Sequence, residues 1–135
     1  MLERDYLMRI IMELGAAIRR SLERAEVERD PGDAARLLEA AVGEATDLDG
    51  ATLLSLAPDS IATIMQATGT DPAVTEYVVR SLYLASHYYD AAGDQPMADL
   101  RAQQAEAIAA AYGHDVTRDD AAPGAMEGFL LNCGY

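Results

Sequence analysis

With 135 residues and a single cysteine, the chain is long enough to form one domain that buries roughly two thirds of its unfolded surface without a disulfide. Its formal net charge of −13 repels phosphate, which excludes nucleic acid and anionic membranes as expected partners. No uncharged stretch is long enough to cross a bilayer and no apolar leader follows Met1, so we expect a cytoplasmic protein.

Residues 2–28 predict a long amphipathic helix. One face carries apolar side chains at helical spacing, and a second set flanks this face on both sides. A single packing surface does not cover both sets, so either another part of this chain or a second copy covers the remainder. Of the two, we expect a second copy, in a homodimer formed through this helix. The core-facing set is Leu7, Ile10, Ile11, Leu14, Ala17, Ile18, Leu22 and Ala25, and the flanking set is Leu2, Tyr6, Met8 and Met12.

The middle of the chain predicts three further helices and no strand. Asp33 caps a helix that ends near Thr46, and residues 51–57 form a short helical segment that Pro58 stops. Residues 59–68 form another short helix, which ends at Gly69. No segment alternates polar and apolar residues, so the fold class is all-α.

Residues 72–92 predict the central helix, around which the other helices pack. Asp71 is a good N-cap, Pro72 suits the first helical position, and Gly93 ends the helix. The apolar side chains cover close to half of the helix circumference, which is typical of a buried helix. These side chains are Val74, Tyr77, Val78, Leu82, Leu84, Ala85, Tyr88 and Tyr89.

The end of the chain predicts one more helix and a tail. Residues 95–112 carry a row of alanines that allows close antiparallel packing against the central helix. The tail, residues 114–135, begins as an exposed linker and ends in an apolar tip at Phe129, Leu130 and Leu131. This tip fills a groove of its own chain or of a second copy, or it is a flexible end.

Two resemblances add an expected fold. Residues 82–106, with Tyr89, Gly93-Asp94, Ala98 and Ala105, resemble one tetratricopeptide hairpin, in which a bulky residue, a Gly-Asp turn and two alanines recur at these separations. Residues 4–11 resemble the start of a family of small bacterial helical proteins of unknown function, whose members open with Asp-Tyr-(Ile/Leu)-Met-Arg. The second resemblance implies a helical fold and no activity.

One line of polar residues on the central helix could carry chemistry. Two carboxylates, a guanidinium, a phenol and an imidazole fall on one side of the helix and could bind a small polar ligand or support acid–base chemistry. The alternative is a solvated helix face that holds one ion pair. This polar row consists of Glu76, Arg80, Tyr83, His87 and Asp90.

Other chemistry finds little support. No Glu-x-x-His pair occurs, and the only possible nitrogen and sulfur ligands are His87, His114 and Cys133, so we expect neither a metal site nor a cofactor. We expect His114, just beyond a helix end, to contact free helix carbonyls. Cys133 has no basic neighbour and the chain has no nucleophile elbow, which argues against nucleophilic catalysis.

The sequence therefore predicts an all-α domain at residues 1–113, of about five helices in antiparallel hairpins, followed by the tail. The preferred function is a non-catalytic protein-interaction or self-assembly module, with a second copy or another protein or peptide as partner. The alternative is a small-molecule binder or an enzyme that uses the polar row.

Overall fold

The computed structural model describes residues 2–133, with side chains from Arg4 onward, and this part of the chain consists of helices joined by turns and loops, without a strand. The all-α prediction is confirmed. The described chain forms α1 (Leu2–Glu26), α2 (Pro31–Thr46), α3 (Gly50–Leu54), α4 (Pro58–Ala67), α5 (Pro72–Ala91), α6 (Gln95–Tyr112), the 3₁₀ turn η1 (Asp119–Ala121) and α7 (Pro123–Cys133).

Aspartate caps begin most of the longer helices. Asp30 accepts a hydrogen bond from the backbone N–H of Asp33 at 3.1 Å, and a proline occupies the first turn of α2. Asp71 and Asp94 cap α5 and α6 in the same way, each with a proline in the first turn. A carboxylate that satisfies a free N–H of the first turn favours the helix start. The predicted starts of α5 and α6 therefore agree with the structure to within a few positions. The predicted cap of α2, Asp33, is wrong: Asp30 is the N-cap, and Asp33 lies in the first turn and donates its backbone N–H to it.

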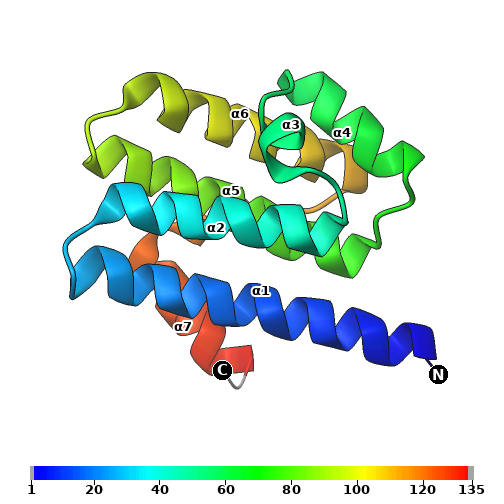
Figure 1. The fold of residues 1–135 in the computed structure, drawn as a ribbon, viewed down its shortest axis with the longest axis horizontal. Helices are drawn as coiled ribbons and strands as arrows, with labels where there is room; N and C mark the ends of the chain where they lie inside the picture. Colours follow the sequence, from blue (N-terminus) through cyan, green and yellow to red (C-terminus); the bar gives the residue numbers. More distant parts are fainter. Residues whose placement is uncertain (1, 134–135) are drawn as a thin grey trace.

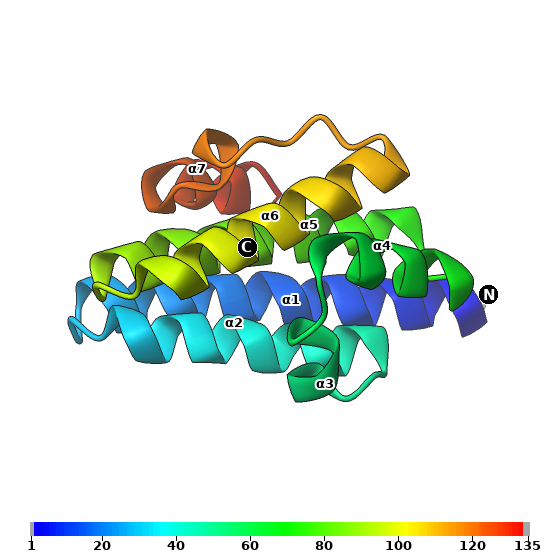
Figure 2. The same cartoon turned by 90° about the horizontal axis from the view of Figure 1, so that it is seen from above.

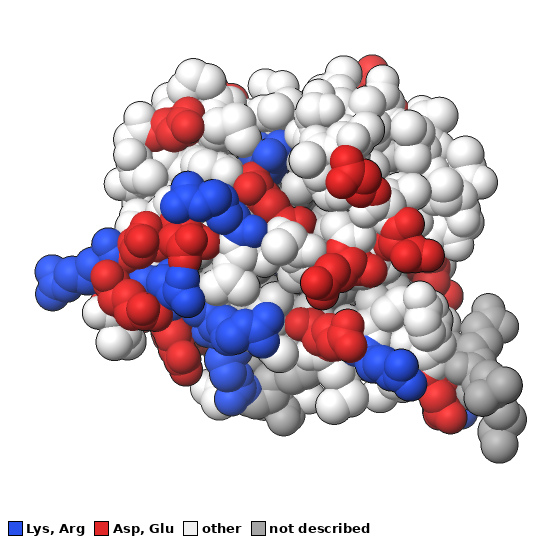
Figure 3. Space-filling model, viewed as in Figure 1, with Lys and Arg blue, Asp and Glu red and all other residues white. Residues whose placement is uncertain are grey.

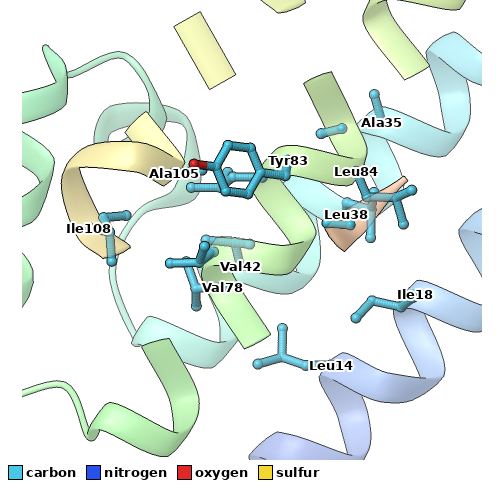
Figure 4. Close-up of a cluster of buried hydrophobic side chains, with 14 of the residues drawn as sticks. Leu14, Ile18, Ala35, Leu38, Val42, Val78, Tyr83, Leu84, Ala105 and Ile108 are labelled. Carbon is cyan, nitrogen blue, oxygen red and sulfur yellow. The ribbon is translucent and has the colours of Figure 1, made fainter. Parts of the chain in front are cut away.

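Helix α5 lies in the middle of the molecule, as predicted. Figures 1 and 2 show it between the α1–α2 pair and α6. All but one of the apolar side chains expected to face inward are buried, and the exception, Tyr77, is partly buried. Figure 4 shows Val78 and Leu84 of α5 in one cluster with Leu14 of α1, Val42 of α2 and Ile108 of α6. Helix α5 therefore packs against α1 and α2 on one side and against α6 on the other.

Two antiparallel hairpins, α1–α2 and α5–α6, form the body (Figure 1). The short helices α3 and α4 lie along α2 and α6, and the side chain of Gln66 on α4 donates to the carbonyl of Ala111 on α6 at 3.2 Å. The described residues form seven α-helices, where the sequence predicts about five. The helix without a predicted counterpart is α7, which lies in the predicted tail; it is short, and tertiary contacts rather than a long amphipathic pattern stabilise it.

The described part of the tail is packed against the body. The predicted linker contains exposed acidic residues, but the side chains of Val116, Ala121, Met126 and Leu130 are buried in the same core cluster as α5. Figure 2 shows η1 and α7 on the face of α5 opposite α2. Helix α7 thus covers one flank of the central helix. None of the helices in the described residues combines the length and apolar character that a membrane span requires.

Candidate functional sites

The tail covers the first half of the polar row on α5. Arg80 pairs with Glu76 one turn earlier, with 3.3 Å between Nε and Oε2. The Arg80 guanidinium also lies over the ring of Phe129, 4.0 Å from the ring centroid, and Phe129 meets Tyr77 edge to face. A cation over an aromatic face is favourable, and more so where water is largely excluded. Glu76 and Arg80 therefore form part of the docking surface for α7.

The second half of the row contacts the linker. His87 Nε2 lies 2.9 Å from the carbonyl oxygen of Arg118, and because a carbonyl only accepts, the imidazole carries its proton on Nε2. The Arg118 side chain donates to the hydroxyl of Ser86 at 3.1 Å and reaches Asp90 at 3.6 Å. The residues of the row share one face of α5 as predicted, but a segment of the same chain occupies that face.

Tyr83 is the member of the row that lines a cavity. This cavity has a volume of about 410 Å³ and lies between α6 and the first residues of the tail. Tyr83 is only 5% exposed, and its hydroxyl makes no hydrogen bond with a described residue. Burial, and secondly the negative charge of Glu106, raise the pKa of the Tyr83 hydroxyl above its ordinary value. Among the described residues, the buried side-chain oxygen that lacks a partner is the hydroxyl of Tyr88 and not that of Tyr83. The Tyr83 hydroxyl can instead bond to water or to a ligand in the cavity.

His114 supplies a second polar group to this cavity. Its Nε2 lies 2.8 Å from the hydroxyl of Thr75, and its ring stacks parallel to that of Tyr112. The imidazole therefore meets a side-chain hydroxyl, while the backbone N–H of His114 donates to the carbonyl of Ala109, the free helix end expected from the sequence. Together with the Glu106 carboxylate, these groups suit a small molecule that donates hydrogen bonds.

A larger groove opens between α2, α3 and α6, with a volume of about 1010 Å³. Its floor holds Arg101, which is 5% exposed and pairs with Glu39 at 2.8 Å. Arg101 also donates to the carbonyl of Leu54 and to the side chain of Gln104, each at 2.9 Å or less. The hydroxyl of Tyr89 donates to the same Glu39 oxygen at 2.8 Å. This buried network ties α2, α5 and α6 to the end of α3.

The hydrogen-bonding groups of this network pair with one another, and acidic side chains lie around the groove above it. Burial, followed by the hydrogen bond and negative charge of Glu39, raises the pKa of Tyr89 to about 12. Figure 3 shows acidic side chains over α3 and the end of α2, while most basic side chains lie over the turn between α1 and α2. The sequence patterns do not predict this network, although Arg101 with Gln104 one turn later in an alanine-rich helix is a visible signal. We interpret this network as structural, because the buried side chains of Arg101 and Gln104 both donate to acceptors within the fold.

The residues predicted for self-association are divided by the structure. Tyr6, Met8 and Met12 are 52%, 53% and 57% exposed. Leu131 is exposed as well, whereas Leu130 is buried and Phe129 is partly buried against α5. The side chain of Leu2 lies outside the described residues. The exposed apolar surface is therefore concentrated on the first half of α1, which extends past the ends of α2 and α7 (Figures 1 and 2).

Within the described residues, no group of three or more His, Cys, Asp or Glu side chains lies close enough together to hold a metal ion. Comparison of the chain with protein-family models, with curated proteins and with solved structures finds no match. The choice between functions consequently depends on the surfaces and cavities of this chain alone.

Proposed function

We propose that the protein is a non-catalytic self-assembly module that forms a homodimer through the first half of α1. The observation that carries the proposal is the exposure of Tyr6, Met8 and Met12 on one projecting helix segment. Met8 and Met12 are one turn apart and are neighbours on the surface, whereas Tyr6 lies on the other side of the core-facing set. Neighbouring large apolar side chains mark interaction sites more often than single scattered ones do. Methionine adapts well to a partner surface because its side chain is flexible and polarizable.

The polar row supports this function over catalysis. The side chains of Arg80, His87 and Asp90 contact the chain's own tail, so they are engaged in holding the tail on the body. A second copy is the partner that requires nothing beyond this chain, and another protein or peptide is the alternative partner for the same surface.

The mass of the protein in solution tests the proposal. Sedimentation equilibrium at micromolar concentration is expected to give twice the chain mass of 14.5 kDa. The double variant Met8→Glu/Met12→Glu places charges on the proposed surface and is expected to be monomeric. Ile64→Glu is the matched control, because Ile64 is also an exposed large apolar side chain but belongs to α4 and not to the proposed surface on α1. A monomeric wild type, or a dimer that the double variant leaves intact, would contradict the proposal.

Two finer features belong to the same proposal. We infer that the α5–α6 hairpin is tetratricopeptide-like, which is supported by Tyr89, the Gly93-Asp94 turn and the close packing of Ala98 and Ala105 against α5. We also propose a cytoplasmic setting, in which the free thiol of Cys133 stays reduced.

A second candidate function is the binding of a small molecule in the cavity at Tyr83. The specific observation is that Tyr83, a residue only 5% exposed, lines the cavity and that none of the described residues hydrogen-bonds to its hydroxyl, which leaves this group available to a ligand. Ligand-observed NMR with a library of small amines and alcohols tests this candidate. Hits that disappear in Tyr83→Phe would support it, and an absence of hits, or hits that the variant retains, would contradict it.

A further inference from the structure

The outer face of α1 carries a straight strip of exposed side chains. Asp5, Met8, Met12 and Arg19 follow one another at intervals of three, four and seven residues, which places them on one line along the helix. All four are exposed. Ala16, half-buried between Met12 and Arg19, leaves room for a larger side chain from outside.

We propose that a second copy packs its α1 antiparallel along this strip, with Met12 on the two-fold axis. This inference rests on the proposed function, and it adds the orientation and register of the dimer. Residues equally far from Met12 then face each other across the axis. Met8 of each copy faces the small side chain of Ala16, and Asp5 of each copy faces Arg19 of the other. A two-fold interface contains every such contact twice.

The charges on the strip select this register. If the helices ran parallel, Asp5 would face Asp5 and Arg19 would face Arg19. If the antiparallel helix moved by one turn, Asp5 would face either Gly15, which has no charge, or Glu23, which repels it. Opposite charges directly across an interface fix register, and like charges oppose it. Among these arrangements, the one centred on Met12 pairs both charges.

A groove beside the strip argues for the same partner. It has a volume of about 390 Å³ and lies between the second half of α1 and α7, with Leu22 and Leu130 among its lining. In the proposed register, the first turn of the second α1 runs toward this groove. The groove is also lined by Glu23, Glu26 and Glu127, and Arg4 in that first turn carries the opposite charge. The groove is therefore continuous with the proposed dimer surface.

Charge reversal tests the register. Asp5→Arg and Arg19→Asp each place like charges across the proposed interface, and each is expected to raise the dissociation constant of the dimer by about tenfold. The combined Asp5→Arg/Arg19→Asp variant restores opposite charges in every pair and is expected to regain wild-type affinity. Circular dichroism checks that each variant is folded, which these exposed positions should permit.

Cysteine cross-linking provides an independent readout. In a Cys133→Ala background, Met12→Cys places two thiols together at the axis, where packed helices bring facing residues within disulfide range. Mild oxidation is expected to give a covalent dimer. Met8→Cys, which faces Ala16 and not itself, is the matched control and is expected to stay largely uncross-linked.

The outcomes separate the two proposals. Rescue by the double charge variant together with selective cross-linking at Met12 supports the register. A wild-type dimer without rescue, or with cross-linking at Met8 instead of Met12, overturns the register and leaves self-assembly standing. A wild type that is monomeric at micromolar concentration overturns both.

Discussion

The buried pair between Arg101 and Glu39 offers the sharpest test of how this fold is held together. Replacing Arg101 by Met keeps an unbranched side chain of similar length, so the packing of its stem is largely preserved. The change removes the donors that reach Glu39, the Leu54 carbonyl and Gln104. The Glu39 carboxylate then stays in a mostly buried position without its cation.

The expected loss follows from the burial of both partners. The side chains of Arg101 and Glu39 are 6% and 17% exposed, so solvent screens this pair weakly. Removing one member of a buried ion pair costs about 3–5 kcal/mol, because the remaining charge is uncompensated. Arg36→Met is the control: its side chain is 63% exposed and 3.7 Å from Asp33, and its removal should cost less than about 1 kcal/mol.

A double-mutant cycle isolates the pair. The free energy of unfolding is measured by urea denaturation, followed by circular dichroism at one fixed protein concentration, for the wild type, Arg101→Met, Glu39→Gln and the combined variant. We expect the combined variant to lose less than the sum of the single losses, with a coupling of about 1–3 kcal/mol. If Arg101→Met unfolds within about 1 kcal/mol of the wild type, or if the losses simply add, the network does not stabilise the fold in this way.

Three further predictions concern packing, pH and the tail. Gly43→Ala should lower the free energy of unfolding by about 1–3 kcal/mol, because a Cβ at this position would lie 2.9 Å from the backbone of α3. Gly124→Ala is the control: a Cβ there meets nothing within 4 Å, so the variant should be neutral or stabilising in thermal melts. Burial raises the pKa of Tyr88 and Tyr89 to about 12. The stability that these two groups contribute is therefore complete below about pH 10 and is lost as the pH rises to about 12. In the double Phe variant, the free energy of unfolding should fall less steeply with pH in this range, and a fall equal to that of the wild type would contradict the prediction. Phe129→Ala removes the ring that contacts Arg80 and Tyr77 of α5, so the amides of α7 should lose hydrogen-exchange protection while those of α5 stay protected. Equal losses of protection in both helices would show that α7 does not open separately.

Local patterns in the chain predict the architecture well. Aspartate caps followed by proline mark the starts of α5 and α6, and positive-φ glycines at positions 93 and 113 mark two ends. At α2 the cap is Asp30, three residues before the predicted Asp33. The width of the apolar surface on residues 72–92 predicts a central helix, which the burial of α5 confirms. These properties depend on neighbours within a few residues, which the sequence displays directly.

The candidate sites are less accessible to sequence reasoning. The spacing of the polar row on one helix can be seen in the sequence. The segment that covers the row cannot, because it depends on the tertiary contacts of Arg118 and Phe129 with α5. The network at Arg101 joins residues more than sixty positions apart, and the cavity at Tyr83 needs α6 and the tail together. No periodic pattern within one helix reports such pairings.

By itself, the sequence determined the helical class, the helix boundaries set by caps and glycines, and the helix that occupies the centre, because each follows from backbone preferences and from the period of one helix. Only the tertiary structure decided that the tail covers the polar row, that Arg101 is paired inside a groove, and that the exposed apolar surface is concentrated on the first half of α1. These depend on which surfaces meet after folding, and that meeting is governed by shape and charge across segments distant in the chain.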